Sequence, residues 1–242
     1  MSGFDPPPAL TAIEELAAFV RSGAGQARDR TWLVGIVGVP GCGKSTLAAA
    51  LCTAVGMPNS ICVSLDDFYL EPAQRQARGQ RWRGPPGTHD LRLLGAFLHD
   101  LKRRTGPIAI PSYDREREQR LPPRVAPAPI GLCVIEGWFV GARTPGQEYE
   151  QLANSLDQLI YLEMDTQLAR EARLEREARL RAAGRGGMSE QAVAQFWDEA
   201  LAPFLPSLVW PLRAVADVVV ALNAAHQVTA LHWASSTLTH GH

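Results

Sequence analysis

The residues of this 242-residue chain that are best suited to chemistry stand in one segment, 38–45, which reads Gly-Val-Pro-Gly-Cys-Gly-Lys-Ser. The segment matches the pattern of a glycine, any four residues and then Gly-Lys-Ser/Thr, with a short apolar run before it and a helix-compatible run after it. Glycines allow consecutive backbone N–H groups to converge on phosphate oxygens, and the following helix adds its positive end. The segment therefore predicts a binding site for a nucleoside triphosphate.

The lysine of this segment is a specific choice, because only Lys44 and Lys102 are lysines among the 24 basic residues. A lysine brings a compact, mobile charge to the β- and γ-phosphates, where the broad guanidinium of an arginine would not fit. We expect Ser45 to bind magnesium and Thr46 to bind the α-phosphate. The residues expected to bind the nucleotide are Gly38, Pro40, Gly41, Cys42, Gly43, Lys44, Ser45 and Thr46.

Carboxylates end two other strand-like segments. The segment 60–65 runs into Asp66 and Asp67, and the segment 132–135 runs into Glu136. The carboxyl ends of parallel strands are where open α/β sheets bind ligands. One acid there can accept the proton of an alcohol that attacks the γ-phosphate, and another can hold water on magnesium. If the strand continued, Asp66 and Asp67 would point in opposite directions and one would face the phosphates; alternatively, such a pair caps a helix.

Alternating elements must position these side chains. Apolar runs predict strands at 32–37, 60–65, 132–135, 158–162 and 216–222. Helical patterns occupy 6–20, 45–55, 91–104 and 166–183, with a break of the first helix at 22–25. Strands that alternate with helices predict an α/β fold with a parallel sheet flanked by helices. Two polar stretches, 71–90 and 112–129, are longer than ordinary connections and are either functional or solvated loops.

Composition excludes several classes of protein. A formal net charge of −1 argues against a nucleic acid or an anionic membrane as the main partner. No apolar run reaches the roughly 18 residues of a membrane span, and the N-terminus does not read as a signal peptide. The four cysteines form no metal-binding pattern and are expected to be reduced, buried thiols. We therefore expect a cytoplasmic protein of one domain, 1–242, with an N-terminal helix and lead-in at 1–30.

Together these motifs resemble the phosphoribulokinase, uridine kinase and pantothenate kinase group of P-loop kinases. Within that group the chain looks like the plant-type D-glycerate 3-kinases and their bacterial relatives, over roughly residues 31–208. The discriminating segments are Ser-Leu-Asp-Asp-Phe-Tyr-Leu at 64–70, Arg-Gly-Pro-Pro-Gly-Thr-His-Asp-Leu at 83–91, Ile-Pro-Ser-Tyr-Asp at 110–114, Glu-Gly-Trp at 136–138 and Gly-Gly-Met-Ser-Glu at 186–190. The resemblance implies the P-loop NTPase three-layer fold with a helical lid.

The resemblance also implies roles for individual residues. Asp66 would be the catalytic base, and Ser45, Asp66 and Glu136 would hold magnesium. Acceptor-side insertions would span 71–129, and the implied substrate-binding residues are Asp67, Tyr69, His89, Asp90, Tyr113, Asp114 and Arg120. Asp90 can equally cap the helix at 91–104. The neighbours Arg115 and Arg117 cannot be ranked against Arg120, because a charge run is also typical of a solvated face.

The predicted helix at 166–183 carries an arginine at every third position from Arg170 to Arg179. In the family this region resembles a lid, here 166–190, whose arginines close on the phosphates. Arg173 fits the catalytic position and could stabilise charge during transfer. Pairing with Glu175 and Glu177 on a solvated helix is the alternative for Arg176 and Arg179.

The sequence thus predicts a kinase that uses ATP and Mg²⁺ and transfers the γ-phosphate to a hydroxyl of a small-molecule acceptor, with D-glycerate as the first candidate. Lys44, Asp66, Glu136 and Arg173 are the expected catalytic residues. A nucleoside, pantothenate or a sugar phosphate is the alternative acceptor. A different class, a P-loop ATPase module that drives a partner, is also open; a GTPase is disfavoured because no guanine-binding Asn-Lys-x-Asp segment occurs.

Overall fold

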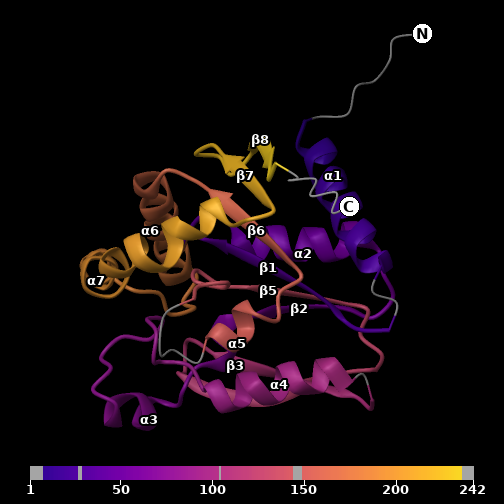
Figure 1. Cartoon of the computed structure of the whole chain (residues 1–242). Helices are drawn as coiled ribbons and strands as arrows, with labels where there is room; N and C mark the ends of the chain where they lie inside the picture. The colour runs from indigo at the N-terminus through magenta and orange to yellow at the C-terminus, as the bar shows by residue number, and fades with distance from the viewer. Residues whose placement is uncertain (1–7, 27–28, 104, 144–148, 236–242) are drawn as a thin grey trace.

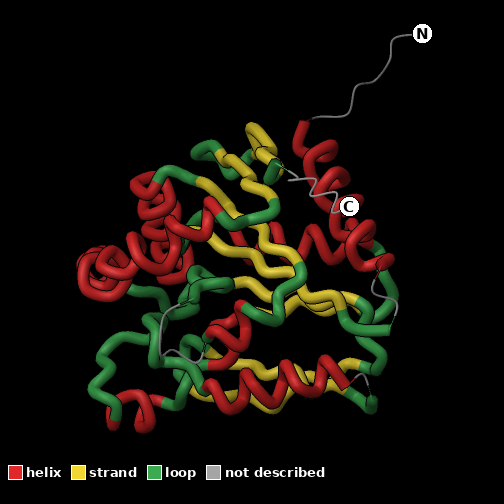
Figure 2. Tube along the Cα trace, viewed as in Figure 1, coloured by secondary structure: helices red, strands yellow, loops and turns green. Residues whose placement is uncertain are grey.

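The computed structural model describes residues 8–26, 29–103, 105–143 and 149–235 (Figure 1). Its centre is a six-stranded sheet, drawn in yellow in Figure 2. In spatial order the strands are β2 (Ser60–Ser64), β5 (Leu132–Glu136), β1 (Trp32–Gly38), β6 (Gln158–Glu163), β7 (Val218–Leu222) and β8 (Val228–Trp233). The first five strands run parallel, which confirms the predicted parallel sheet.

The sixth strand, β8, was not predicted and pairs antiparallel with β7 at the edge of the sheet. Its residues are half-buried or exposed, whereas every residue of β5 is buried. An edge strand needs no continuous apolar run, so its sequence carries a weak signal.

Helices cover both faces of the sheet and extend beyond it (Figure 1). On one face α1 (Pro8–Gln26) packs on α2 (Lys44–Val55), and α2 lies against β1, β2 and β5. On the other face a series of short turns reaches β6. These turns are η2 (Trp197–Leu201), η3 (Ala202–Phe204), η4 (Leu205–Val209) and η5 (Trp210–Ala214). The remaining helices are η1 (Leu65–Phe68), α3 (Pro72–Ala77), α4 (Leu91–Arg103), α5 (Glu150–Ala153), α6 (Thr166–Ala182) and α7 (Glu190–Phe196).

The predicted break of the first helix at 22–25 is wrong. Helix α1 continues to Gln26, and Ala24 on its last turns is buried. Gly23 lies against the indole of Trp32, where a Cβ would come within 2.5 Å of Cζ2. The glycine therefore permits a close approach to β1, and packing outweighs its weak helix propensity. Residues 6 and 7 of the predicted helix lie outside the described residues.

The polar stretch 112–129 is mostly not a loop. β3 (Ile108–Asp114) and β4 (Gln119–Ala126) form an antiparallel hairpin, which is a second, two-stranded sheet. Ile108, Ile110 and Tyr113 on β3 are buried, whereas β4 is largely exposed. An exposed edge strand tolerates the charged and proline residues that suggested a loop.

Among the described residues, no helix has the length and the apolar character that crossing a membrane requires.

Candidate active site

A cavity of about 1700 Å³ opens where the parallel strands end. The P-loop, the hairpin β3–β4, helix α6 and the segment around Trp82 all contribute to its walls. Of the residues expected to take part in catalysis or binding, those lining the cavity are Pro40, Gly41, Cys42, Gly43, Lys44, Ser45, Thr46, Asp66, Tyr69, Tyr113, Asp114, Glu136 and Arg173. The tertiary structure therefore brings segments more than 100 residues apart to one space.

The phosphate-binding loop is shaped by glycines. Gly41 and Gly43 have φ values of 102° and 95°, and a Cβ at Gly41 would lie 2.1 Å from the carbonyl oxygen of Ala169. Lys44 is buried, and its Nζ donates hydrogen bonds to the carbonyls of Gly38 (2.9 Å) and Val39 (3.0 Å). Gly38 itself is not among the lining residues but anchors the ammonium. The loop thus holds a buried cation at the N-terminus of α2.

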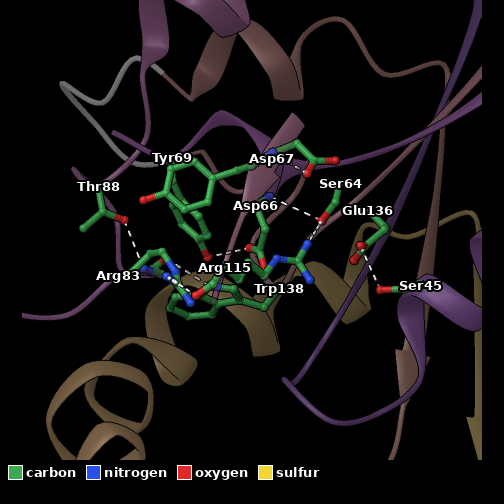
Figure 3. Close-up of polar contacts among 12 residues, drawn as sticks. Ser45, Ser64, Asp66, Asp67, Tyr69, Arg83, Thr88, Arg115, Glu136 and Trp138 are labelled. Carbon is green, nitrogen blue, oxygen red and sulfur yellow. Dashed lines mark hydrogen bonds and ion pairs between the residues drawn. The ribbon is translucent and has the colours of Figure 1, made fainter. Parts of the chain in front are cut away.

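Two hard oxygen donors meet beside this cation. Ser45 Oγ donates to Glu136 Oε1 at 2.9 Å, and Figure 3 shows the two side chains facing each other from α2 and the end of β5. Glu136 is buried at the end of a fully buried strand. A hydroxyl and a carboxylate next to a phosphate-binding loop are the oxygen donors that Mg²⁺ prefers, so these residues fit a magnesium site.

The strand before the aspartate pair ends one residue earlier than the sequence suggested. β2 stops at Ser64 and the chain enters the 3₁₀ turn η1, which Ser64 caps by accepting a hydrogen bond from Asp66 N (3.3 Å). The alternation of a strand therefore does not apply to Asp66 and Asp67. The turn still sends them in different directions (Figure 3): Asp66 lines the cavity, while Asp67 accepts a hydrogen bond from Tyr113 N (3.3 Å) and ties η1 to the hairpin.

The carboxylate of Asp66 is held from two sides. Tyr69 Oη donates to Oδ1 at 2.6 Å, and Arg115 Nε lies 3.6 Å from Oδ2. Burial acts to raise the pKa of Asp66, but Arg115 and Tyr69, helped by His89 and Lys44, lower it below its ordinary value. Asp66 is therefore an ionised carboxylate at neutral pH. By contrast, burial raises the pKa of Asp67.

Three residues implied to bind the acceptor lie behind the cavity wall instead of in it. Asp90 caps α4 by accepting from Leu93 N (3.0 Å) and forms an ion pair with Arg120 Nη2 (3.1 Å). The same nitrogen donates to the carbonyl of Tyr69 at 3.1 Å. His89 is fully covered and its Nδ1 lies 2.9 Å from Tyr149 Oη. Asp67 does not line the cavity either. In this structure these side chains support the residues around Tyr69 and do not face the cavity.

The burial of His89 has an electrostatic consequence. Its ring packs on Tyr69 at 4.7 Å and on Phe139 at 5.5 Å between centroids. Burial lowers the pKa of His89 to about 4, and the charge of Asp66 opposes this shift only in part. His89 is therefore neutral at physiological pH.

Two arginines outside the expected set of site residues line the cavity beside Tyr69 and Tyr113. Arg83 lies over the rings of Tyr69 (5.4 Å) and Tyr113 (5.8 Å), and its Nη1 pairs with Glu118 at 2.8 Å. Arg75, from α3, is buried and pairs with the same carboxylate at 2.9 Å. Both arginines lie in the polar stretch 71–90. Arg83 begins the segment 83–91 that resembles the kinase family, whereas composition was the only signal for Arg75.

The helix α6 brings one arginine of its stripe into the buried part of the site. Arg173 lines the cavity with its guanidinium 4.5 Å from the ring centroid of Phe196. Burial lowers the pKa of Arg173, while Glu177, Tyr69 and Asp66 raise it in part. Arg170, one turn earlier, lies 3.8 Å from Asp198 and is not among the lining residues.

The end of the predicted lid is built by a turn rather than by pairing along the helix. Glu177 Oε2 accepts a hydrogen bond from Met188 N at 2.9 Å, so this acid holds the turn that follows α6. Gly187 has a φ of 99°, and a Cβ there would lie 2.7 Å from the Glu177 carbonyl. Arg176 and Arg179 line the cavity instead of only facing solvent.

The sequence also gave no hint of a contact from the far end of the chain to the P-loop. His226, in the turn between β7 and β8, places Nε2 2.8 Å from the carbonyl oxygen of Gly41. It has a φ of 59° and lines the cavity beside Ala224 and Ala225.

Comparison with known proteins agrees with this geometry. Residues 33–228 match the model of the "Phosphoribulokinase / Uridine kinase family". An uncharacterised kinase of Schizosaccharomyces pombe is 27% identical over 237 aligned positions, which cover 78% of this chain and 84% of that protein.

Solved structures show the same fold. A candidate fructose transport system kinase from Silicibacter sp. TM1040 has a TM-score of 0.66 at 26% identity and covers 78% of this chain and 90% of its own. A D-glycerate 3-kinase from Cryptococcus neoformans has a TM-score of 0.72 at 21% identity, and the match covers 92% of this chain and 99% of that chain. The family match spans most of the chain and includes the P-loop, the aspartate turn and helix α6. The chain therefore belongs to the phosphoribulokinase/uridine kinase family and is a small-molecule kinase.

Proposed function

We propose that this kinase uses ATP and magnesium to phosphorylate a hydroxyl of a small anionic metabolite, with D-glycerate as the best candidate. The observation that carries the proposal is the convergence on one cavity of Lys44, the Ser45–Glu136 pair and the ionised Asp66. Phosphoryl transfer needs this set: a cation for the phosphates, oxygen ligands for the metal, and a base near the acceptor.

The chain's own residues divide the work as follows. The glycines of the P-loop and Lys44 bind and orient the triphosphate, and Thr46 binds the α-phosphate. Ser45, Asp66 and Glu136 would hold the magnesium ion, which when bound neutralises phosphate charge. The acceptor oxygen forms a bond to the γ-phosphorus, the bond from that phosphorus to the bridging oxygen breaks to leave ADP, and Asp66 accepts the acceptor's proton.

Arg173 acts on the same transfer. It lies in the cavity on α6, and burial makes its charge more effective there than it would be in water. We propose that it stabilises the charge that develops on the phosphoryl group. In this proposal the chain is one kinase domain, with a lid at 166–190 and the acceptor-side segment at 71–129.

The wall opposite the P-loop supports an anionic acceptor. Arg75, Arg83 and Arg115 line it, and two of them already bind a carboxylate, that of Glu118. Tyr113 also lines the cavity, with its Oη buried and without a hydrogen bond among the described residues. Arginine is suited to bidentate binding of carboxylates, as glycerate would require. The resemblance of 64–70 and 83–91 to glycerate 3-kinases supports the same choice.

A screen of acceptors tests the proposal. ADP release would be measured with D-glycerate, a nucleoside, pantothenate and a sugar phosphate, each with the wild type and with Asp66→Asn. We expect D-glycerate to accelerate ADP release strongly in the wild type only. Acceleration by another acceptor would support the kinase activity and assign a different substrate to it. Slow release that no acceptor changes would instead support an ATPase module.

The setting proposed for this reaction is the cytoplasm. All four cysteines are free thiols, Cys42 and Cys133 buried and Cys52 and Cys62 partly buried, which suits a reducing compartment.

A further inference from the structure

Glu199 occupies a position that the proposed reaction does not explain. It lies on η2, a π-helical turn, and such turns recur at functional sites. Its Oε2 accepts a hydrogen bond from Trp82 Nε1 at 2.7 Å and pairs with Arg81 Nη1 at 3.2 Å. Its Oε1 accepts from Gln195 Nε2 at 2.7 Å. One carboxylate thus joins the acceptor-side segment to the segment that follows the lid.

The contacts continue from Trp82 toward the phosphates. The indole of Trp82 meets the ring of Phe196 edge to face at 5.4 Å. Phe196 also closes on the backbone of the acceptor-side segment, because a Cβ at Gly84 would lie 3.4 Å from its Cζ. The other partner of the Phe196 ring is the guanidinium of Arg173, at 4.5 Å. Glu199, Trp82, Phe196 and Arg173 therefore form a continuous chain of contacts.

The Phe196 ring at the end of these contacts is one of the groups that hold Arg173. The Nε of Arg173 is buried and makes no hydrogen bond within the part of the chain that the structure describes. The aromatic face on which the guanidinium lies therefore helps to orient it, together with the nearby charges of Glu177 and Asp66. The ring of Phe196 is in turn oriented by Trp82, whose Nε1 is held by Glu199.

The charge of Glu199 suits this role. Hydrogen bonds from Trp82 and then from Gln195, together with the charge of Arg81, lower the pKa of this carboxyl. Glu199 is thus ionised at neutral pH, and a hydrogen bond to an ionised group is stronger than one between neutral groups. The guanidinium carbon of Arg81 also lies 4.7 Å from the centroid of the Trp82 ring. The indole is therefore held both at its edge, by Glu199, and on its face, by Arg81.

We propose that Glu199 is a positioning residue for phosphoryl transfer: through Trp82 and Phe196 it sets the place of Arg173, so that the lid arginine is aligned by the acceptor side of the cavity. This inference rests on the proposed function only in the assignment of Arg173 to the transfer. The contacts themselves predict a second, activity-independent property, namely that loss of Glu199 loosens residues 78–84.

A double-mutant cycle on the kinase reaction tests the route through Arg173. Glu199→Ala should lower kcat by about 3- to 30-fold and leave the KM for ATP within about twofold. If Glu199 acts through Arg173, adding Glu199→Ala to Arg173→Ala should lower kcat by no more than about twofold further. Losses that multiply in the double variant would overturn the proposal. Glu199→Gln keeps one acceptor for Trp82 Nε1 and should recover most of the kcat.

The matched control is Glu163→Ala. Glu163 pairs on the surface with Arg213, its side chain is 38% exposed against 42% for Glu199, and it lies outside the cavity. This variant should keep the wild-type kcat, and a loss equal to that of Glu199→Ala would make the effect unspecific and overturn the proposal.

Amide hydrogen exchange separates this inference from the proposed function. In Glu199→Ala the residues 78–84 should exchange faster than in the wild type or in Glu163→Ala, whichever acceptor the enzyme uses. Unchanged exchange there would overturn the inference even if D-glycerate is the substrate. If residues 78–84 exchange faster but the protein phosphorylates no acceptor, the contact between Glu199 and the acceptor-side segment is supported. The proposed function and the positioning role would then both be overturned.

Discussion

The two ends of the cavity are built in different ways. At the nucleotide end, consecutive residues from 38 to 46 supply the loop, the cation and the hydroxyls, and the glycine backbone shapes the loop. At the proposed acceptor end, side chains from α3, the hairpin and α6 make ion pairs and ring contacts. A backbone site is local and tolerates little change within its motif, whereas a side-chain site depends on distant partners.

The largest effect is expected at the nucleotide end. Lys44→Ala should abolish phosphoryl transfer, because nothing else in the loop supplies a mobile charge to the phosphates. Lys44→Arg should also fail, since the buried ammonium sits between two loop carbonyls at 2.9 and 3.0 Å. Coupled measurement of ADP production checks both variants. Lys102→Ala, at the exposed lysine of α4, is the control, and wild-type turnover in Lys44→Ala would remove the P-loop from the mechanism.

The next effect is expected where the two ends meet. Asp66→Asn keeps the shape of the side chain and removes the base, so kcat should fall by about 10²–10⁴-fold while ATP still binds. Asp67→Asn should matter much less, because Asp67 binds the hairpin backbone and does not line the cavity. Turnover and ATP affinity would be measured for both. If Asp67→Asn proves the more damaging, the base is assigned to the wrong aspartate.

The pH dependence of turnover adds to this test. The pKa of Asp66 lies below its ordinary value, so the base stays ionised as the pH falls to about 4. We therefore expect no loss of kcat between pH 8 and about 5 that originates from Asp66. A single ionisation near pH 6.5 in the profile of kcat would assign the base to another group.

A smaller effect on turnover is expected on helix α6, the proposed lid. Arg173→Ala should lower kcat by about 10- to 100-fold and change ATP affinity less, because a group that acts mainly in the transition state affects kcat. Arg170→Ala is the matched control, since Arg170 stands one turn earlier on α6 and pairs with Asp198 outside the cavity. Weaker ATP binding with an unchanged kcat would show that Arg173 acts in the binding of ATP and not in the transition state.

The smallest effect concerns stability and not turnover, and it probes the wall behind the acceptor side. His89 is buried with a pKa of about 4, against an ordinary value of 6.5, so the unfolded chain binds a proton more readily between these values. The free energy of unfolding should therefore decrease as the pH falls from 6.5 to 4, by at most about 3 kcal/mol from this residue.

Denaturant unfolding at several pH values checks this expectation. His89→Asn keeps a polar group toward Tyr149 but cannot titrate, so its unfolding free energy should vary less with pH than that of the wild type in this window. An equal slope in both proteins would show that His89 does not contribute to the acid sensitivity of the fold.

The elements that were predicted correctly share one property: each corresponds to an uninterrupted run of residues that has the pattern of a strand or a helix. β1, β5 and β6 are continuous apolar runs, and the ends of α2 and α6 follow from local composition. The two segments that were predicted wrongly lack such a run. Gly23 stays helical because Trp32 packs on it, and β4 is polar because it lies at an exposed edge. Both outcomes depend on neighbours that are distant in sequence.

The sequence by itself determined the phosphate-binding loop, the acids at or just after the ends of two strands, and the parallel sheet that collects them at one edge. These follow from short-range patterns, because glycine dihedrals and apolar periodicity are local properties. Only the tertiary structure decided which polar residues face the cavity. It placed Arg75, Arg83 and Arg115 on the wall, and it turned His89, Asp90 and Arg120 to support that wall from behind. The physical reason is that a side chain's partner is set by packing between segments, and packing joins residues whose spacing in the sequence carries no period.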